Sequence, residues 1–245
     1  MLDDYIAQTQ RLLNDEQANF YNVVDLQAYV NIGRNTIAMQ AECLIANATL
    51  STISGQQSYG MTGVAPPSAA LAAAINVRSI RSIISGVGAM LDARPWAWFL
   101  AYQLTGVNTG ATGAPTVWSM QSQGSLGTLW FSPTPASTVI LSVEAAWVPV
   151  PLTSDATPEA LAYPWTDAVP YFAAYLGYVN AQRATDAQKM LMLFNVFMKA
   201  ARVGVTPEVT PPTWPNAKGF QAAFDPQASN LPGARPAQGG EGALG

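Results

Sequence analysis

The strongest constraint on the fold is a run of apolar residues at helical spacing between Tyr163 and Arg202. Apolar residues recur there every three or four positions, first in one segment and then in a second. The two sets are Trp165, Val169, Phe172, Leu176 and Val179, and then Ala187, Met190, Leu191, Phe194, Phe197, Met198 and Ala201. The spacing predicts a hairpin of two helices that needs further apolar partners. We take Trp165, Phe172, Leu176, Phe194 and Phe197 as its main core or interface residues.

Local signals predict where these two helices begin and end. Thr185 and Gln188 have the spacing of a capping box, which predicts that Thr185 caps the second helix. Pro164 suits the start of the first helix, and Pro170 is compatible with it only in the first turn. Gly204 follows the last apolar residue, a typical position for a helix end.

Two more helices are predicted near the N-terminus. Residues 2–14 form the first, with the stripe Tyr5, Ile6, Thr9, Leu12 and Leu13. The second begins with Asp25 as N-cap and runs to about Asn47, with the stripe Leu26, Val30, Gly33, Ile37, Ala41 and Leu44. A helical glycine costs about 1 kcal/mol relative to alanine, so Gly33 on this stripe predicts close approach of another helix. We expect the hairpin to be that partner.

The middle of the chain has a β-rich composition, with many Ser, Thr, Gly and β-branched residues. Ile75, Val77, Ile80 and Ile83 predict an irregular strand after an Ala/Pro-rich loop at 64–74, and residues 94–102 predict a short helix. Residues 116–121, 127–131 and 138–148 predict three strands of an antiparallel meander. In the last, Val139, Leu141, Val143, Ala145 and Trp147 alternate against Ser142 and Glu144.

These elements predict an α+β fold in which the N- and C-terminal helices form a bundle and a β-rich antiparallel meander is inserted between them. The predicted boundaries are 1–48 for the N-terminal helices, 49–152 for the insertion, 153–204 for the C-terminal hairpin and 205–245 for an extended tail. The tail is rich in proline and glycine and cannot bury enough of its own surface to fold alone. Trp214, Phe220 and Phe224 are the residues that we expect to anchor it, and Arg235 is a possible ion-pair partner.

The composition argues for a protein covered by other chains and against nucleic-acid wrapping. Apolar residues make up 49% of the 245 residues, while only 11% are charged against about 25% in typical domains. We infer that neighbouring chains cover much of the surface, the alternative being a solitary polar surface. A net charge of −4 with scattered basic residues does not provide the basic patch that nucleic-acid binding needs.

The sequence also lacks the residues of most catalytic and metal sites. There is no histidine, which excludes Ser-His-Asp and Cys-His catalysis and most zinc sites. Cys43 is the single cysteine, and we expect it to be a small buried residue on a helix. No phosphate-binding glycine motif is present, so we expect no cofactor and no metal. No apolar run reaches the length of a membrane span, and the acidic start lacks the basic region of a signal peptide.

Two sets of polar residues have both a chemical and a structural interpretation. Asp155, Glu159 and Asp167 have the residue type for acid–base catalysis, but their positions favour charges at helix N-termini. Tyr171, Tyr175 and Tyr178 form a second helical stripe with only Arg183 nearby. A base-stacking surface would need more basic residues, so helix–helix contact is the better interpretation.

The order of these segments resembles one protein family. Residues 9–15 (TQRLLND) and a helix containing Ile32-Gly33-Arg34 precede a β-rich middle with Val117-Trp118-Ser119-Met120 and Leu129-Trp130-Phe131-Ser132-Pro133. The segment 159–170 (EALAYPWTDAVP) and the paired helices follow. Over about residues 1–202, this arrangement resembles the head-to-tail adaptor, or connector, proteins of tailed bacteriophages.

The resemblance implies a structural protein of the virion neck without catalytic residues. Such adaptors form a ring, usually of twelve copies, below the portal, where they extend the DNA channel and provide the platform for the tail. The expected partners are therefore other copies of the chain, the portal protein and tail or nozzle proteins, with DNA only passing through. The family's C-terminal segments embrace the portal, which assigns portal docking to Trp214, Phe220, Phe224 and Arg235. Another ring protein of the phage neck or tail (a nozzle or tail-completion protein) and a hydrolase using only Asp and Glu remain as alternatives.

Overall fold

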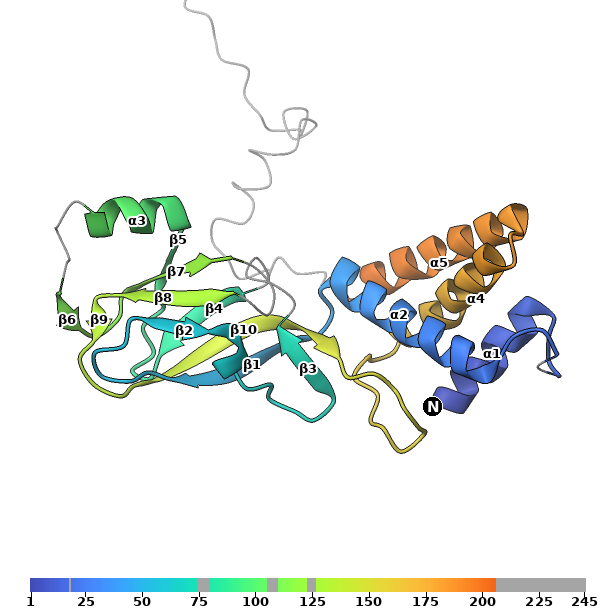
Figure 1. The fold of residues 1–245 in the computed structure, drawn as a ribbon, viewed down its shortest axis with the longest axis horizontal. Helices are drawn as coiled ribbons and strands as arrows, with labels where there is room; N and C mark the ends of the chain where they lie inside the picture. Colours follow the sequence, from blue (N-terminus) through green and yellow to red (C-terminus); the bar gives the residue numbers. More distant parts are fainter. Residues whose placement is uncertain (18, 75–79, 105–109, 123–126, 206–245) are drawn as a thin grey trace, which may run out of the picture. The chain divides into compact units, whose positions relative to one another are not determined.

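The chain has a mixed α and β structure in the part described by its computed structural model, residues 1–17, 19–74, 80–104, 110–122 and 127–205 (Figure 1). Helices α1 (Leu2–Leu13) and α2 (Val23–Ala41) come first in the chain. Helices α4 (Val169–Asn180) and α5 (Ala184–Val205) come last, and the 3-10 turn η4 (Trp165–Ala168) precedes them. The strands and the short helix α3 (Trp96–Leu104) lie between these two pairs in the sequence.

Helix α4 contacts both N-terminal helices, and small residues allow the close approach (Figure 1). A Cβ atom placed on Gly33 of α2 would lie 3.4 Å from the carbonyl oxygen of Val169 and 3.5 Å from the Cβ of Phe172. On α4, a Cβ at Gly177 would lie 3.0 Å from a methyl group of Leu13 in α1. The close approach predicted for Gly33 is therefore confirmed, and its partner is the first helix of the hairpin.

The boundaries of α2 differ from the prediction at both ends. Asn22, not Asp25, is the N-cap, and its side chain accepts a hydrogen bond from the Val24 N–H at 3.0 Å. The helix ends at Ala41 rather than near Asn47, and strand β1 (Ile45–Ser51) begins four residues later. Pairing with a long strand provides this segment with more backbone hydrogen bonds and burial than another helical turn would. Cys43 consequently lies between α2 and β1, half-buried against the core rather than on a helix.

The boundaries of α5 also differ from the prediction. The helix begins at Ala184, so Thr185 is its second residue and not its N-cap. It continues through Gly204 to Val205, so the glycine does not end it. The prediction for Pro170 is confirmed, because this residue lies in the first turn of α4, where no intrahelical hydrogen bond from its nitrogen is needed.

A sheet around the long strand β10 (Ile140–Pro149) includes β1, β3 (Leu71–Ala74) and β4 (Ile80–Ser85). Strand β1 pairs with β10 antiparallel from Ile45 opposite Ala146 to Ser51 opposite Ile140. Strands β4 and β3 also pair with β10, at residues 141–145 and 147–149 of that strand. Residues 71–74 thus form a strand where a loop was predicted, and Ile75 and Val77 lie outside the described residues.

A second sheet has the order β2-β8-β7-β5, with β2 at Ser58–Gly60, β8 at Thr128–Ser132, β7 at Val117–Gln121 and β5 at Asp92–Arg94. The predicted strands 116–121 and 127–131 are confirmed and pair antiparallel. The predicted three-stranded meander is wrong, because β10 belongs to the first sheet and β5 pairs with β7 in parallel. Strands β6 (Thr112–Gly113) and β9 (Thr134–Pro135) form a short parallel pair.

The predicted short helix is confirmed as α3, which packs against the second sheet. Phe99 is fully buried, and Trp96 lies 5.7 Å from its ring in a stacked arrangement. The Trp96 ring also lies 5.4 Å from that of Trp130 in β8. Aromatic contacts therefore join this helix to the second sheet.

Candidate functional site

The predicted core residues of the hairpin are buried to different degrees. Trp165 and Phe194 are buried, while Phe172, Leu176 and Phe197 are half-buried. The Phe172 ring lies 4.9 Å from that of Phe194, so α4 and α5 contact each other through aromatic side chains. The stripe predicted for α5 agrees with its burial, since Ala187, Phe194, Met198 and Ala201 are buried.

The face of α4 that is buried differs from the predicted one. Its fully buried positions are occupied mainly by small residues, namely Val169, Pro170, Ala173, Ala174, Gly177 and Tyr178. Val179, which was predicted to lie inside, is 48% exposed. Small side chains let α4 lie close to α1 and α2, and the larger Phe172 and Leu176 remain at the margin of this contact.

The tyrosine stripe of α4 makes contacts within the chain. The Tyr178 hydroxyl donates a hydrogen bond to the carbonyl oxygen of Leu12 at 2.9 Å. The Tyr171 ring stacks on that of Phe197, with 4.6 Å between centroids. The guanidinium of Arg183 lies 4.9 Å from the Tyr178 ring. These contacts agree with the expected helix–helix role of the stripe.

A buried polar junction, made by Arg34 and its partners, joins α2 to the segment that follows β10. Arg34 and Glu159 form an ion pair at 2.8 Å, with side chains only 1% and 7% exposed. A second guanidinium nitrogen donates to the carbonyl oxygen of Val150 at 2.9 Å and to the Asn31 side chain at 3.0 Å. Asn31 in turn donates to the Leu152 carbonyl and accepts from the Leu152 N–H. The junction satisfies the backbone hydrogen-bonding groups of Val150 and Leu152, and it fixes where the chain returns from the strands to the helices.

The connection between α1 and α2 is held by one buried carboxylate. Asp15 accepts hydrogen bonds from the N–H groups of Asn19, Phe20 and Tyr21 at 2.9, 3.0 and 2.9 Å. Burial alone would raise the pKa of Asp15, but these hydrogen bonds lower it below its ordinary value. The same connection leaves the Phe20 side chain 86% exposed.

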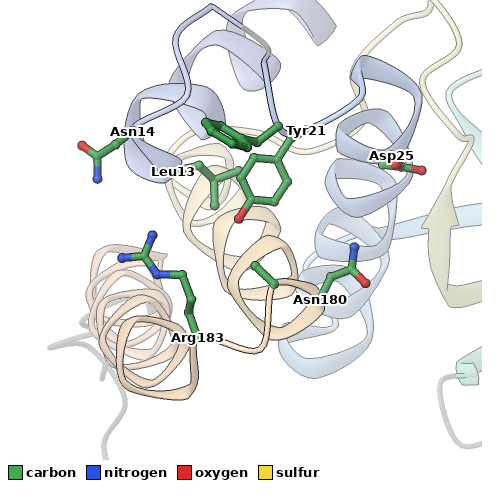
Figure 2. Close-up of a pocket in the computed structure, with 8 residues that line it drawn as sticks. Leu13, Asn14, Tyr21, Asp25, Asn180 and Arg183 are labelled. Atoms are coloured by element: carbon green, nitrogen blue, oxygen red, sulfur yellow. The ribbon is translucent and has the colours of Figure 1, made fainter.

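An open pocket of about 460 Å³ lies beside this connection, where α1 and α4 end and α2 begins (Figure 2). Leu13 and Tyr21 face one another at its centre, and Arg183 approaches from the connection between α4 and α5 (Figure 2). Asp186 accepts from Arg183 at 2.6 Å, so this cation is already paired. The lining residues are Leu13, Asn14, Phe20, Tyr21, Asp25, Asn180, Ala181 and Arg183. These lining residues provide no arrangement of nucleophile and base.

Asp155, Glu159 and Asp167, the acidic residues considered for acid–base catalysis, belong to different parts of the structure. Asp155 accepts hydrogen bonds from the Asp3 N–H at 3.0 Å and from the Met1 amino group at 2.9 Å, which lower its pKa to about 2. Its carboxylate therefore lies at the N-terminus of α1, where the helix dipole favours negative charge. Glu159 belongs to the polar junction, and Asp167 lies in η4.

The described residues form neither a metal-binding cluster nor a membrane-spanning helix. No group of three or more His, Cys, Asp or Glu side chains in this part of the chain has an arrangement that would hold a metal ion. Among the same residues, no helix has the length and apolar character needed to cross a membrane. The predicted portal-docking residues Trp214, Phe220, Phe224 and Arg235 lie outside the described part of the chain.

Sequence reasoning missed the polar junction and the apolar outer surfaces of α2 and α5. Val24, Ile32 and Met39 on α2 are 66%, 47% and 56% exposed. On α5, Met192 and Val196 are 63% and 61% exposed. A sequence signal for the outer surfaces existed, since both helices have apolar residues on more than one face.

Comparison with known proteins identified no matching protein-family model and no matching curated protein.

Proposed function

We propose that this chain is a head-to-tail adaptor of a tailed bacteriophage, a structural protein of the virion neck. Copies of it form a ring below the portal, extend the DNA channel and provide the attachment platform for the tail or nozzle proteins. The fold proposed for this role is a helical bundle built from both ends of the chain, with a β-rich insertion between its halves and an extended C-terminal tail.

The observation that carries the proposal is the way the two ends of the chain meet. Helix α4 contacts α1 and α2, although more than 120 residues separate them in the sequence. Between them, the described residues form mainly strands, together with the short helix α3. This order supports the resemblance, together with the segment 159–170, which contains the buried partner Glu159 and leads into η4 and α4.

The chemistry of the described residues favours a structural role over an enzymatic one. The sequence has no histidine, and Glu159 and Asp155 are engaged in structural contacts, with Arg34 and with the N-terminus of α1. The Cys43 thiol is half-buried, and burial raises its pKa to about 11, so it is a poor nucleophile at neutral pH. We therefore propose that the protein acts by contact, with no cofactor and no metal.

The tail is proposed as the docking segment for the portal. Residues 206–245 contain few charges and three large aromatic residues among many prolines. Proline restricts the free chain, so less entropy is lost when an extended segment binds. Trp214, Phe220 and Phe224 would act as anchors, each worth about 2 kcal/mol when fully buried in an interface.

Binding to purified portal rings tests this function directly. We expect the full chain to co-migrate with portal rings of the same phage in size-exclusion chromatography, and a chain ending at Val205 to keep its helical circular dichroism but lose at least about 90% of the binding. The triple variant Trp214→Ala, Phe220→Ala, Phe224→Ala tests the three proposed anchors in a chain of full length. If the shortened chain binds portal rings undiminished, the tail is not the anchor. If the full chain binds tail proteins but never the portal, another neck or tail ring protein is the better assignment.

A further inference from the structure

The outer stripe of α2, defined here as Val24, Ala28, Ile32 and Met39, is an apolar surface that the described residues of the chain leave exposed. At 100° per residue these four positions lie within about 80° of one another around the helix. All four are exposed, and Val24 and Met39 are more than half so. The opposite face of α2, with Leu26, Val30 and Ile37, is fully buried. A helix that is apolar on both sides is typical of an element that is covered on both sides.

The outer face of α5, defined here as Lys189, Met192, Leu193, Val196 and Lys199, is a second such surface. Met192, Leu193 and Val196 are 63%, 40% and 61% exposed. They lie along one side of the helix, between the two lysines, and the buried residues Phe194 and Met198 lie on the other side. A large apolar residue that points to solvent is common by itself, but three neighbours on one side of a helix are not.

Each of the two surfaces has one charged residue without an ion pair among the described residues, and these two charges are of opposite sign. At the start of the α2 stripe, Asp25 lies in the first turn and has no ion pair among the described residues, while Glu42, just past the last turn, is paired with Arg81 at 3.3 Å. On the α5 face, Lys189 is paired with Asp186 at 3.3 Å, while Lys199 at the other end has no ion pair among the described residues. The opposite charges of Asp25 and Lys199 favour contact between an α2 stripe and an α5 face, and the like charges of two Lys199 side chains disfavour contact of the α5 face with itself.

We propose that the outer stripe of α2 on one copy docks on the outer face of α5 on the next copy. The two surfaces are different, so the contact is heterologous, and repetition of a heterologous contact closes into a ring when the rotation permits. This inference rests on the proposed function, and it names the surfaces through which copies of the chain meet. It also accounts for a low proportion of charged residues, 11% of the chain.

Single charges introduced on each surface test the contact. Ile32→Glu places a carboxylate in the α2 stripe, and Val196→Glu places one in the α5 face. The control Ala7→Glu adds the same charge at an exposed position of α1 outside both surfaces. All three positions are exposed, so thermal unfolding followed by circular dichroism is expected to leave the melting temperature unchanged within a few degrees.

Analytical ultracentrifugation of the full chain between about 1 and 100 µM gives the first readout. We expect the wild-type chain and Ala7→Glu to associate beyond the dimer as concentration rises. Ile32→Glu and Val196→Glu are each expected to raise the concentration of half-association about 100-fold, as loss of a central interface residue does.

An equimolar mixture of Ile32→Glu and Val196→Glu gives the decisive readout. Each pair of unlike chains retains one intact α2 stripe facing one intact α5 face, while the remaining two surfaces are both altered. The mixture is therefore expected to form heterodimers and nothing larger. The proposed contact is wrong if either variant associates like the wild type, or if the mixture forms no heterodimers.

The proposed function and this contact fail in distinguishable ways. If the wild-type chain stays monomeric at 100 µM yet binds portal rings, or if the double variant Ile32→Glu/Val196→Glu still forms rings, the contact is wrong and the adaptor function stands. If the chain forms rings that the two variants abolish but never binds the portal, the contact stands and the adaptor function is wrong.

Discussion

Arg34 is the residue whose environment most directly links the strands to the helices. Its side chain is 1% exposed and satisfies Glu159, Asn31 and the Val150 carbonyl together. Removing one partner of a buried ion pair leaves the other charge without compensation. We expect Arg34→Met to lower the free energy of unfolding in urea by about 3–5 kcal/mol.

The exposed ion pair of Lys189 with Asp186 provides the control for this prediction. Lys189→Met removes a cation whose side chain is 65% exposed, and solvent screening limits the expected change to within about 0.5 kcal/mol. The double variant Arg34→Met/Glu159→Met is expected to be more stable than Arg34→Met alone. An Arg34→Met protein as stable as the wild type would show that the junction contributes nothing to folding.

Asp15 predicts how stability depends on pH. Its pKa is lower in the folded chain than the ordinary value of 3.8, so the folded state favours the ionised form. This stabilisation is present at neutral pH and is lost as pH falls below about 3.8 toward the folded pKa. Asp15→Asn should therefore lower the melting temperature at pH 7, with a smaller difference from the wild type at pH 3. A difference of the same size at both pH values contradicts the role of the charge, and Glu16→Gln is the exposed control.

The residues of the polar junction could not be predicted because their partners are far apart in sequence. Arg34 and Glu159 are 125 positions apart, and neither local spacing nor helix periodicity relates them. The N-cap of α2 was misplaced for a local reason. Asn22 and Asp25 are both residue types that cap helices, and only the backbone conformation of Asn22 decides between them.

At the level of elements, Gly33 sets how closely α2 and α4 approach. A Cβ at this position would lie 3.4 Å from the Val169 oxygen and 3.5 Å from the Phe172 Cβ, which is ordinary contact. Gly33→Ala should therefore leave the stability unchanged or raise it by up to about 1 kcal/mol through helix propensity. Gly33→Leu should lower it by about 1–3 kcal/mol, because the longer side chain forces the two helices apart. Urea unfolding measures both, and equal stability of the two variants would contradict the close contact.

Periodicity predicted that the helices exist but was less successful with their faces and the pairing of strands. The predicted stripe of α4 contained Val169, Phe172, Leu176 and Val179. Of these only Val169 is buried, and the other buried positions include Ala173, Ala174 and Gly177. A close helix contact selects small residues, which a count of large apolar residues overlooks. Alternation predicted strand β10, but its pairing with β1, β3 and β4 depends on residues distant in sequence.

For the whole molecule, the sequence predicted the mixed α and β content. It left open which surfaces meet neighbours, because an apolar residue on a helix is equally consistent with a core and with an interface. Val24 and Ile32 are examples, since only the arrangement of the helices shows that they are exposed.

The net charge of −4 bears on the affinity of the proposed ring for DNA. A subunit that neutralises few phosphates releases few counterions, and its affinity for DNA is correspondingly low. We expect a dissociation constant weaker than about 10 µM for duplex DNA in filter binding at physiological salt. A portal-free preparation is the proper sample, so that the chain alone is tested. Tight binding that resists added salt would be inconsistent with a channel through which DNA slides.

Native mass spectrometry of purified portal rings saturated with the full chain tests the central claim most directly. The adaptor assignment predicts a single stoichiometric complex in which every portal ring holds one ring of this chain, twelve copies if the family resemblance extends to number. The mass increment divided by the mass of one chain, 25.9 kDa, gives that number. Portal rings whose mass is unchanged, or increments that scatter without a closed number of copies, would contradict the assignment.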